Sequence, residues 1–502
     1  MKLNIKHILL LLLSALLLEM SFAPFNQYYT AFFALLPLLF ILEKVKNGFL
    51  TGLIWGIFYS ILSIHWLALN TGTFPWLATF SMLLASVFLA LNYGFIGMFF
   101  KMIQRKDALL AFLFLPFTWT AVEFLRSFGI FGFPWLSLGH SQAYNTVYVQ
   151  MADIGGVYTV SFILLLTNLF LFLMIKNYTR KRLLALIMII LVPFIYGTIM
   201  INSDLSSDKK LNFRIVQPNI PAKEKWIPAN RIPIINKLDS LSRTENGFQP
   251  DVIVWPETAV PYYIRSSIYI THLVNQCAVE MNSTLITGAL DFFYKKDESD
   301  RHLSTNTMFV FEPERSTFNS AIYDKLHLVP FGEFTPGGSM FSWLNNMEYG
   351  QSEFSHRNFR SPLKMTSDSI AFTPMICYDS VFPHTVRSFS SQGSKYNILI
   401  TNDIWFGRSV GPHQHAAIAI VRAIETRRPL IRSANAGISM FIDEKGRVLD
   451  RLPLYTSGIL DCSLEEGTYS SVYVKTGKLF GISMSVIMLI GMIFSLWPKR
   501  KK

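Results

Sequence analysis

Long apolar runs dominate residues 1–202 and then stop, so the chain has two halves of different pattern. A helix that spans a bilayer needs about 20 predominantly apolar residues. Such runs predict about eight transmembrane helices, of which the first two are short: 8–22, 28–42, 48–69, 77–100, 108–125, 157–175, 183–201 and 479–497. The pattern therefore predicts an α-helical polytopic membrane domain of seven helices at 1–202. A last transmembrane helix with a basic tail is predicted at 478–502.

Short apolar runs replace the long ones from Leu211 onward, and they alternate with amphipathic stretches. Continuous short apolar runs predict strands buried on both faces of a sheet. Alternation with helices indicates an α/β fold in layers, here at 203–477. We predict strands at 213–220, 251–257, 283–290, 305–313, 320–331, 370–379, 396–407 and 429–437, a hairpin at 438–450, and helices at 231–242, 267–281, 383–392 and 413–426.

Lysine and arginine mark every second boundary between the predicted spans. Lys2 and Lys6 precede the first span, and basic clusters follow the second, fourth, sixth and eighth. The loops at 23–27 and 70–76 contain neither residue type. The positive-inside rule therefore places both termini in the cytoplasm and the 203–477 segment outside.

The composition agrees with a membrane protein. The chain is 51% hydrophobic and 16% charged, which is too apolar for an ordinary soluble protein. Its net charge of +12 lies largely in the clusters that flank the spans, so it indicates topology and argues against nucleic-acid binding. Residues 1–23 also have the pattern of a cleaved signal peptide, but Pro24 directly after the cleavage position and the further spans favour an uncleaved first helix.

A thiol, an amine and a carboxylate each follow or interrupt an apolar strand. Cys377 lies in TPMICYDSVFP, Lys325 in YDKLHLVPFGEFTP and Glu257 in VIVWPETAVP. An ordinary thiol is mostly protonated at neutral pH and needs a base or a cation to become a good nucleophile. The sequence therefore predicts a site in which Cys377 is the nucleophile, Glu257 accepts its proton and Lys325 stabilises the thiolate and the oxyanion.

Other titratable residues leave alternatives open. Glu333 could hold Lys325 or accept a proton, and His327 is a rival base, although a structural role is the simpler interpretation. Metal binding is weakly supported, because His413 and His415 are two residues apart and no cysteine pair accompanies them. No phosphate-binding or dinucleotide-binding motif is present, so we predict no metal and no cofactor.

The cysteines and one long loop complete the predictions. An odd number of cysteines in an oxidising compartment leaves at least one unpaired, and we expect it to be Cys377. A Cys277–Cys462 disulfide is an open alternative. The excursion at 335–362 is long for a loop without function, so we predict a lid or arm there.

Several motifs carry a family resemblance. VWPET, the lysine of DKLHLVPFGE, and ICYD followed by NDIWFG resemble the nitrilase, or carbon-nitrogen hydrolase, superfamily, whose triad is Glu, Lys and Cys. The predicted spans together with further motifs resemble one membrane-bound branch, the apolipoprotein N-acyltransferase family: APF near residue 23, EFLR and GFPW at 123–135, QPNI and KW at 217–226, and GPxQH at 411–415. The resemblance implies an α-β-β-α nitrilase-like domain on the outer face of a bacterial inner membrane.

The resemblance also implies roles for particular residues. The family's triad corresponds to Glu257, Lys325 and Cys377, and its auxiliary glutamate to Glu333. Two tryptophans and a tyrosine match positions associated with substrate or with the mouth of the site: Trp226, Trp135 and Tyr378. The family commonly has Cys-Tyr-Glu, whereas Asp379 stands in the third place here, which keeps the carboxylate but shortens it by one methylene.

The implied reaction is an acyl transfer in two steps. A phospholipid, usually phosphatidylethanolamine, acylates the cysteine, and the α-amine of a diacylglyceryl-cysteine apolipoprotein then takes the acyl group. The resemblance implies an enzyme that works as a monomer in the membrane. Three alternatives are a membrane-anchored amidase or nitrile hydrolase with the same triad, a non-catalytic receptor on the same fold, and a transporter. An enzyme that takes both substrates from the bilayer explains the spans best.

Overall fold

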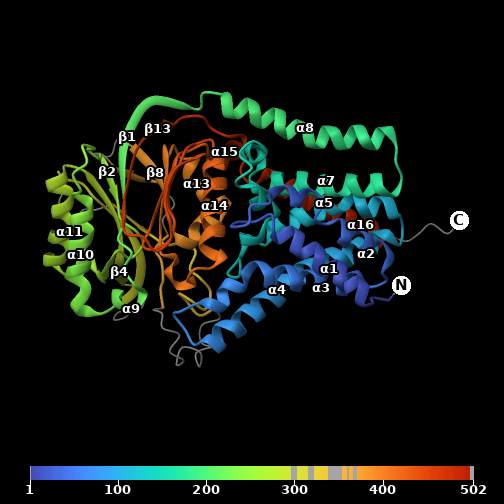
Figure 1. Cartoon of the computed structure of the whole chain (residues 1–502), viewed down its shortest axis with the longest axis horizontal. Helices are drawn as coiled ribbons and strands as arrows, with labels where there is room; N and C mark the ends of the chain where they lie inside the picture. Colours follow the sequence, from blue (N-terminus) through green and yellow to red (C-terminus); the bar gives the residue numbers. More distant parts are fainter. Residues whose placement is uncertain are drawn as a thin grey trace. The chain divides into compact units, whose positions relative to one another are not determined.

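The computed structural model describes residues 2–294, 302–314, 321–336, 353–358, 361–365 and 370–497. The chain forms two compact units (Figure 1). We call residues 1–70, 75–203 and 476–502 the helical unit, and residues 71–74 and 204–475 the sheet unit. Most of the predicted lid at 335–362 and all of the basic tail at 499–502 lie outside the described residues.

The helical unit contains six helices that are long and apolar enough to cross a membrane, counted over the described residues. They are α3 (Gly48–Ile64, which continues to Leu69), α4 (Pro75–Gln104), α5 (Ala108–Leu125), α7 (Val157–Lys176), α8 (Arg180–Asn202) and α16 (Leu479–Leu496). These match six of the predicted spans. The other two predicted spans hold shorter elements, α1 (Ile5–Glu19, 15 residues) and α2 (Leu36–Lys44, 9 residues), because the chain turns after Met20 and α2 begins only beside Pro37.

Small residues set the packing of the helical unit. A Cβ atom on Gly52 of α3 would lie 2.0 Å from the carbonyl oxygen of Tyr93 on α4, and one on Gly97 would lie 2.1 Å from that of Gly48. Only glycine permits backbones to approach this closely. Such contacts are typical of helices that pack inside a membrane, where dispersion and not the hydrophobic effect drives association.

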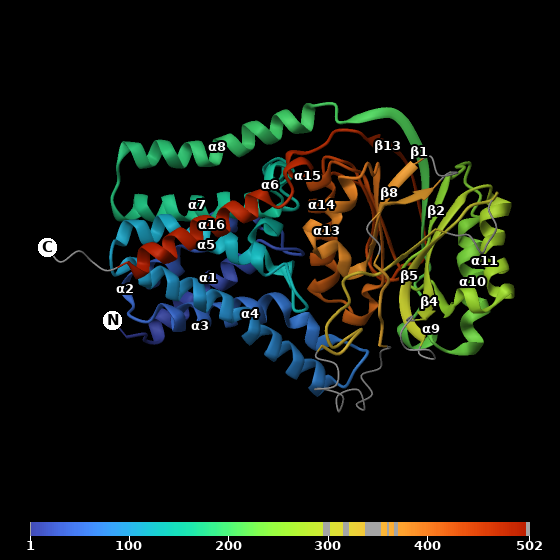
Figure 2. The ribbon, with the colours of Figure 1, turned by 180° about the vertical axis from the view of Figure 1, so that it is seen from behind.

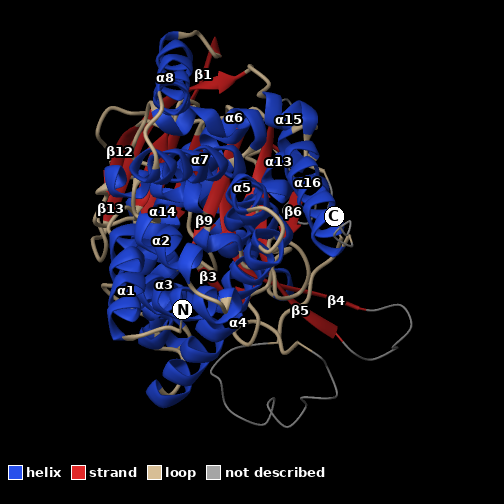
Figure 3. Cartoon of the chain, turned by 90° about the vertical axis from the view of Figure 1, so that its right-hand side faces the viewer, coloured by secondary structure: helices blue, strands red, loops and turns tan. Residues whose placement is uncertain are grey.

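The sheet unit is built on two sheets. The first has the strand order β13-β1-β2-β4-β5-β6, with β3 paired to β4, and the second has the order β12-β11-β10-β9-β8-β7. The described strands, drawn in red in Figure 3, all lie within residues 204–475. Their bounds are β1 Ser206–Gln217, β2 Val252–Val254, β3 Val260–Tyr263, β4 Thr284–Tyr294, β5 His302–Phe311, β6 Ala321–Asp324, β7 Leu363–Met365, β8 Ile370–Ile376, β9 Tyr396–Thr401, β10 Leu430–Ala434, β11 Ser439–Ile442, β12 Val448–Leu452 and β13 Gly458–Gly467.

Helices cover the outer face of each sheet (Figures 1 and 2). Helices α10 (Arg231–Ser242) and α11 (Ile268–Met281) cover the first, and α13 (Pro383–Ser390) and α14 (Val410–Thr426) cover the second. Strand β2 shows why its sequence is apolar throughout: Val252 and Val254 pack between the sheets, whereas Ile253 packs under the helices. The predicted α-β-β-α sandwich is therefore confirmed.

The strand predictions were incomplete in several places, and the short strands β3 and β7 were not predicted. The strand predicted at 320–331 is shorter, because β6 ends at Asp324 and Phe331 has a left-handed backbone with φ of 60°. Lys325 therefore lies at the strand end and not inside the strand. Strand β13 was not predicted, because it is an edge strand with three buried positions among ten and lacks a continuous apolar run.

Candidate active site

Three strand ends of the sheet unit bring the predicted triad together. Glu257 follows β2, Lys325 follows β6, and Cys377 follows β8. The Lys325 Nζ atom lies 3.4 Å from Glu257 Oε1 and 2.6 Å from Glu333 Oε1. The charges of Glu257 and Lys325 both act on the thiol of Cys377. The structure thus places one ammonium between two carboxylates, beside one thiol.

The Glu257 loop is fixed at several points. Thr258 has a left-handed φ of 44°, and the loop packs so closely on Gly288 that a Cβ there would lie 2.5 Å from the Thr258 nitrogen. Asn306 donates its side-chain amide to Glu257 Oε1 at 2.8 Å, and Lys225 donates to the Glu257 backbone oxygen at 3.0 Å. Glu257 is 5% exposed, so its carboxylate is preorganised and largely shielded from water.

Lys325 is held in its charged form. Burial alone lowers the pKa of a lysine, but the carboxylates of Glu333 and Glu257 outweigh it and raise the pKa of Lys325 well above its ordinary value. Glu333 is itself fixed, because its other oxygen accepts the Val329 backbone N–H at 2.9 Å. A permanently cationic Lys325 suits the stabilisation of a developing negative charge.

Cys377 opens a short 3-10 helix, Cys377–Val381, directly after β8. Its φ of 48° is left-handed, which is strained for a residue with a side chain. Burial raises the pKa of its thiol, the charge of Glu257 adds to that effect, and Lys325 opposes it. Although part of the residue reaches the surface, the thiol is therefore protonated at neutral pH and must lose its proton to a neighbouring base in order to react.

The two residues after Cys377 face different surroundings. Tyr378 is largely buried, and its ring packs edge-on against Phe382 with 5.1 Å between the ring centres. Asp379 is fully buried and accepts hydrogen bonds from the Tyr323 hydroxyl at 3.0 Å and from the backbone N–H groups of His327 and Ile376 at 2.8 and 3.1 Å. Asp379 therefore joins the loop after β6 to the loop that carries Cys377.

Replacing Asp379 with asparagine tests the buried position of this carboxyl through the pH dependence of stability. Burial raises the pKa of Asp379 from 3.8 to about 7. Between these values the folded state binds a proton that the unfolded state has lost, so this carboxyl's contribution to stability falls as pH rises from about 4 to 7. We expect the melting temperature of wild type minus that of Asp379→Asn to decrease by about 5 °C between pH 5 and pH 8. The measurement is thermal unfolding in detergent.

The exposed carboxylate of Asp450 on β12 provides the control for this prediction. The difference between wild type and Asp450→Asn should stay flat over the same pH range. A difference for Asp379→Asn that is constant, or that increases with pH, would contradict the assignment.

His327, the rival base, is engaged elsewhere. Its ring stacks on Phe382 with 3.7 Å between ring centres, and Nε2 lies 2.7 Å from the Thr385 hydroxyl. Burial lowers the pKa of His327 to about 3, so the ring is neutral near pH 7. These contacts are those of a structural histidine.

One group of possible metal ligands lies beside the site. A ligand atom each of Cys377, Asp403 and His415 falls within 4.8 Å of the others. Asp403 and His415 are bonded to each other at 2.8 Å, however, and an Arg432 nitrogen lies 2.8 Å from Asp403 and 3.1 Å from His415 Nδ1. A metal ion there would sit against a guanidinium, so the charges of this group do not suit a cation.

All three cysteines are free thiols. Cys277 lies inside α11 in the core under the first sheet, where burial raises its pKa to about 12. Cys462 lies on β13 and is partly exposed. The alternative of a Cys277–Cys462 disulfide is therefore wrong.

The two predicted substrate tryptophans lie in different units. Trp226 follows the short helix α9 (Ala222–Lys225) of the sheet unit and is 42% exposed, with the Lys225 ammonium 6.0 Å from its ring centre. Trp135 belongs to the helical unit and is 7% exposed, with its ring centre 5.0 Å from that of Trp66. A contact of either residue with substrate remains a prediction.

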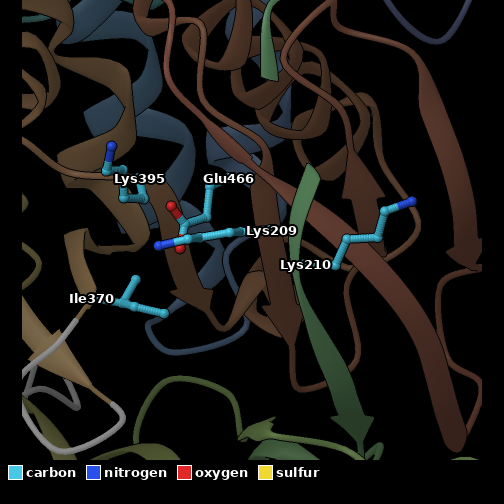
Figure 4. A pocket seen from close by; sticks show the side chains of 5 residues that line it. All are labelled: Lys209, Lys210, Ile370, Lys395 and Glu466. Atoms are coloured by element: carbon cyan, nitrogen blue, oxygen red, sulfur yellow. The ribbon is translucent and has the colours of Figure 1, made fainter. Parts of the chain in front are cut away.

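A surface pocket of the sheet unit is not part of the site (Figure 4). It is lined by Lys209, Lys210, Ile370, Lys395 and Glu466. Ile370 begins β8, whereas Cys377 follows the other end of the same strand. The pocket therefore lies near the opposite end of β8 from the triad.

Sequence reasoning missed several residues that surround the triad, and it considered His415 as a metal ligand and as part of a family motif, without a place beside Cys377. Asn306 and Lys225 bond to Glu257, and a chain formed by Asp403, His415 and Ser380 lies under Cys377. The signal for Asn306 was present, because an amide inside the apolar strand TNTMFVF needs a buried partner. No sequence signal distinguishes Ser380 from any other serine in a turn.

Comparisons with known proteins identify the family. Residues 14–170 match the family described as Apolipoprotein N-acyltransferase N-terminal domain, and residues 214–472 match Carbon-nitrogen hydrolase. An apolipoprotein N-acyltransferase of Chlorobaculum tepidum is 32% identical over 91% of this chain and 90% of its own length. One of Geobacter metallireducens is 29% identical over 94% and 92%. A carbon-nitrogen hydrolase structure from Helicobacter pylori aligns at 13% identity over 58% of this chain and 96% of its own, with a TM-score of 0.39. The chain therefore belongs to the apolipoprotein N-acyltransferase family.

Proposed function

We propose that this acyltransferase moves a fatty acyl chain from a phospholipid, through a thioester on Cys377, to the N-terminal amine of an S-diacylglyceryl-cysteine apolipoprotein. The observation that carries the proposal is the buried ammonium of Lys325, which lies between Glu257 and Glu333. The charges of Lys325 and Glu257 both act on the protonated thiol of Cys377. Catalysis by Glu257, Lys325 and Cys377 follows a ping-pong order, because both half-reactions use the same thiol.

The first half-reaction forms the thioester. Glu257 accepts the thiol proton, and the sulfur attacks the carbonyl carbon of the phospholipid ester. Lys325 stabilises the oxyanion of the tetrahedral intermediate, an effect worth about 3–4 kcal/mol of barrier for one such donor. The C–O bond then breaks, and Glu257 returns the proton to the departing oxygen of the lysophospholipid.

The second half-reaction forms the amide. The neutral α-amine of the acceptor attacks the thioester carbonyl, and Lys325 again stabilises the oxyanion. The C–S bond breaks, and Glu257 takes the proton that the amine loses and delivers it to the sulfur. The free thiol of Cys377 is regenerated, and no external oxidant or cofactor is consumed.

The location follows from charge and from the apolar helices. The basic clusters after alternate spans support an inner-membrane protein with both termini in the cytoplasm and with residues 203–477 on the periplasmic side. Phosphatidylethanolamine is the expected donor, and a monomer is the expected working form. Both the donor and the acceptor are lipids or lipid-anchored, which accounts for the helical unit.

A membrane-anchored hydrolase is not favoured. The named relatives match nearly the full chain, including the helical half that a soluble amidase lacks. A thioester open to water would hydrolyse, whereas Glu257 and Lys325 lie in a largely dry site.

A transfer assay decides between the two functions. The purified full chain in detergent receives phosphatidylethanolamine labelled in its acyl chains and a peptide that begins with S-diacylglyceryl-cysteine. We expect label on the peptide in a bond stable to neutral hydroxylamine, together with an equal amount of lysophospholipid. The same peptide with an acetylated α-amine should stay unlabelled. Release of labelled fatty acid without labelled peptide would establish a hydrolase instead.

A further inference from the structure

A chain of buried hydrogen bonds reaches the backbone of Cys377 from residues on or next to β9, β10 and α14. It starts at Asp403, which follows β9, passes through His415 on α14, and ends at Ser380 in the 3-10 helix that Cys377 opens. His415 Nδ1 lies 2.8 Å from Asp403 Oδ1, and His415 Nε2 lies 2.8 Å from the Ser380 hydroxyl. We call these three residues the Asp403–His415–Ser380 chain.

This chain ends on the backbone of Cys377. The Ser380 hydroxyl donates to the Cys377 carbonyl oxygen at 2.8 Å, and His415 Nε2 lies 3.2 Å from the same oxygen. Cys377 holds a left-handed φ of 48°, a conformation that persists in a side-chain-bearing residue only when its surroundings fix it. The Ser380 hydroxyl, which is itself in contact with His415 Nε2, holds this carbonyl and supplies such a restraint.

The far end of the chain is anchored by a buried ion pair. Asp403 Oδ2 accepts from Arg432 on β10 at 2.8 Å, and both residues are buried. Arg432 and His415 keep the pKa of Asp403 well below its ordinary value against the effect of burial, so the carboxylate is ionised. A Cβ on Gly437 would lie 2.4 Å from Asp403 Oδ2, so the glycine leaves room for this carboxylate.

An ionised Asp403 determines how the imidazole is oriented. A carboxylate only accepts hydrogen bonds, so His415 Nδ1 carries a hydrogen and donates it. Nε2 then faces Ser380 and Cys377, as it does when a histidine is held by a carboxylate behind a reacting group.

We propose that His415 is a positioning residue for the proposed acyl transfer: acting through Ser380 and the Cys377 carbonyl, it holds the nucleophile in its strained conformation. The inference rests on the proposed function of Cys377. A displacement of a reacting atom by about 1 Å can cost about a hundredfold in rate, so a residue that fixes the backbone of the nucleophile acts on the chemical step and not on lipid binding.

The test compares His415→Phe with His413→Phe, a control two residues earlier on the same helix and outside the chain. Thioester formation from labelled phosphatidylethanolamine is followed in a single turnover. We expect the rate constant of His415→Phe to fall by about 10–100-fold, with the phospholipid concentration for half-maximal rate changed by less than about threefold. His413→Phe should match wild type. His415→Gln, whose amide can reach Ser380, should recover part of the rate constant.

The rate constant separates positioning from stability. A mutation that only unfolds part of the sample lowers the amplitude of the single turnover and leaves its rate constant unchanged. Ser380→Ala removes the same link from the other side, so its effect should not add to that of His415→Phe. If His415→Phe does not fold, His415→Gln and Ser380→Ala carry the test.

Three results would overturn the proposal. They are an unchanged rate constant in the His415 and Ser380 variants, a loss confined to phospholipid affinity, and an equal loss in His413→Phe. Alkylation of Cys377 by iodoacetamide, followed on its peptide by mass spectrometry, distinguishes failure of the inference from failure of the proposed function. If wild type forms no thioester, the proposed function fails, and slower alkylation of Cys377 in His415→Phe than in His413→Phe still reports the positioning.

Discussion

Replacing Cys377 with alanine should abolish the capture of acyl chains by the protein. Wild type given acyl-labelled phosphatidylethanolamine without an acceptor should carry label that neutral hydroxylamine removes, because a thioester is the product of the first half-reaction. Alanine has no nucleophile at this position, and the other polar groups around it cannot form the acyl-enzyme, so no protein-bound label should remain above background. Protein-bound radioactivity after gel separation measures the result.

Cys462→Ala is the matched control, because Cys462 is also a free, partly exposed thiol of the sheet unit. This variant should retain the full label. Label that survives in Cys377→Ala and disappears in Cys462→Ala would move the nucleophile to the other thiol. Absence of label in folded wild type would reject the thioester step and direct the search to soluble amide substrates.

Replacing Glu257 with glutamine should lower the rate constant of thioester formation by about 10²–10⁴-fold, the usual contribution of a general base. Glutamine keeps the shape of the side chain but cannot accept the thiol proton. Burial holds the pKa of Cys377 above its ordinary value, so the variant reacts only through the small fraction of thiolate that forms unaided. Its residual rate should therefore rise about tenfold per pH unit between pH 7 and 9.

Glu280→Gln tests whether the loss is specific to Glu257. Glu280 is an exposed carboxylate at the end of α11, where it pairs with Arg243. The rate constant of this variant should equal that of wild type. A Glu257→Gln enzyme whose rate stayed within about tenfold of wild type would assign the base to another group, of which Glu333 is the nearest to Lys325.

The elements that sequence predicted best are those whose pattern depends on burial alone. Six long apolar runs became helices long enough to span a membrane, and continuous apolar strands such as 252–254 became the centre of a sheet. Each apolar run indicates only that its residues are buried away from water. The edge strand β13 was missed for the same reason, because seven of its ten positions are not fully buried.

The candidate triad was predictable because each of its residues conflicts with its local surroundings. A lysine beside an apolar strand and a carboxylate between two prolines are costly unless they are paired, and their types indicated nucleophilic chemistry. The family resemblance joined them into one site. The positions of the basic clusters at alternate span boundaries could also be read from the sequence, and the proposed membrane orientation follows from them.

Only the tertiary structure decided which groups support the triad. Asn306, Lys225 and Ser380 are ordinary polar residues in the sequence, and their contacts join segments that are far apart along the chain. The strained backbones of Cys377 and Thr258 are also invisible in the sequence. The physical reason is that a hydrogen bond or a shifted pKa depends on what lies within a few ångströms, and that distance is set by the packing of the two sheets.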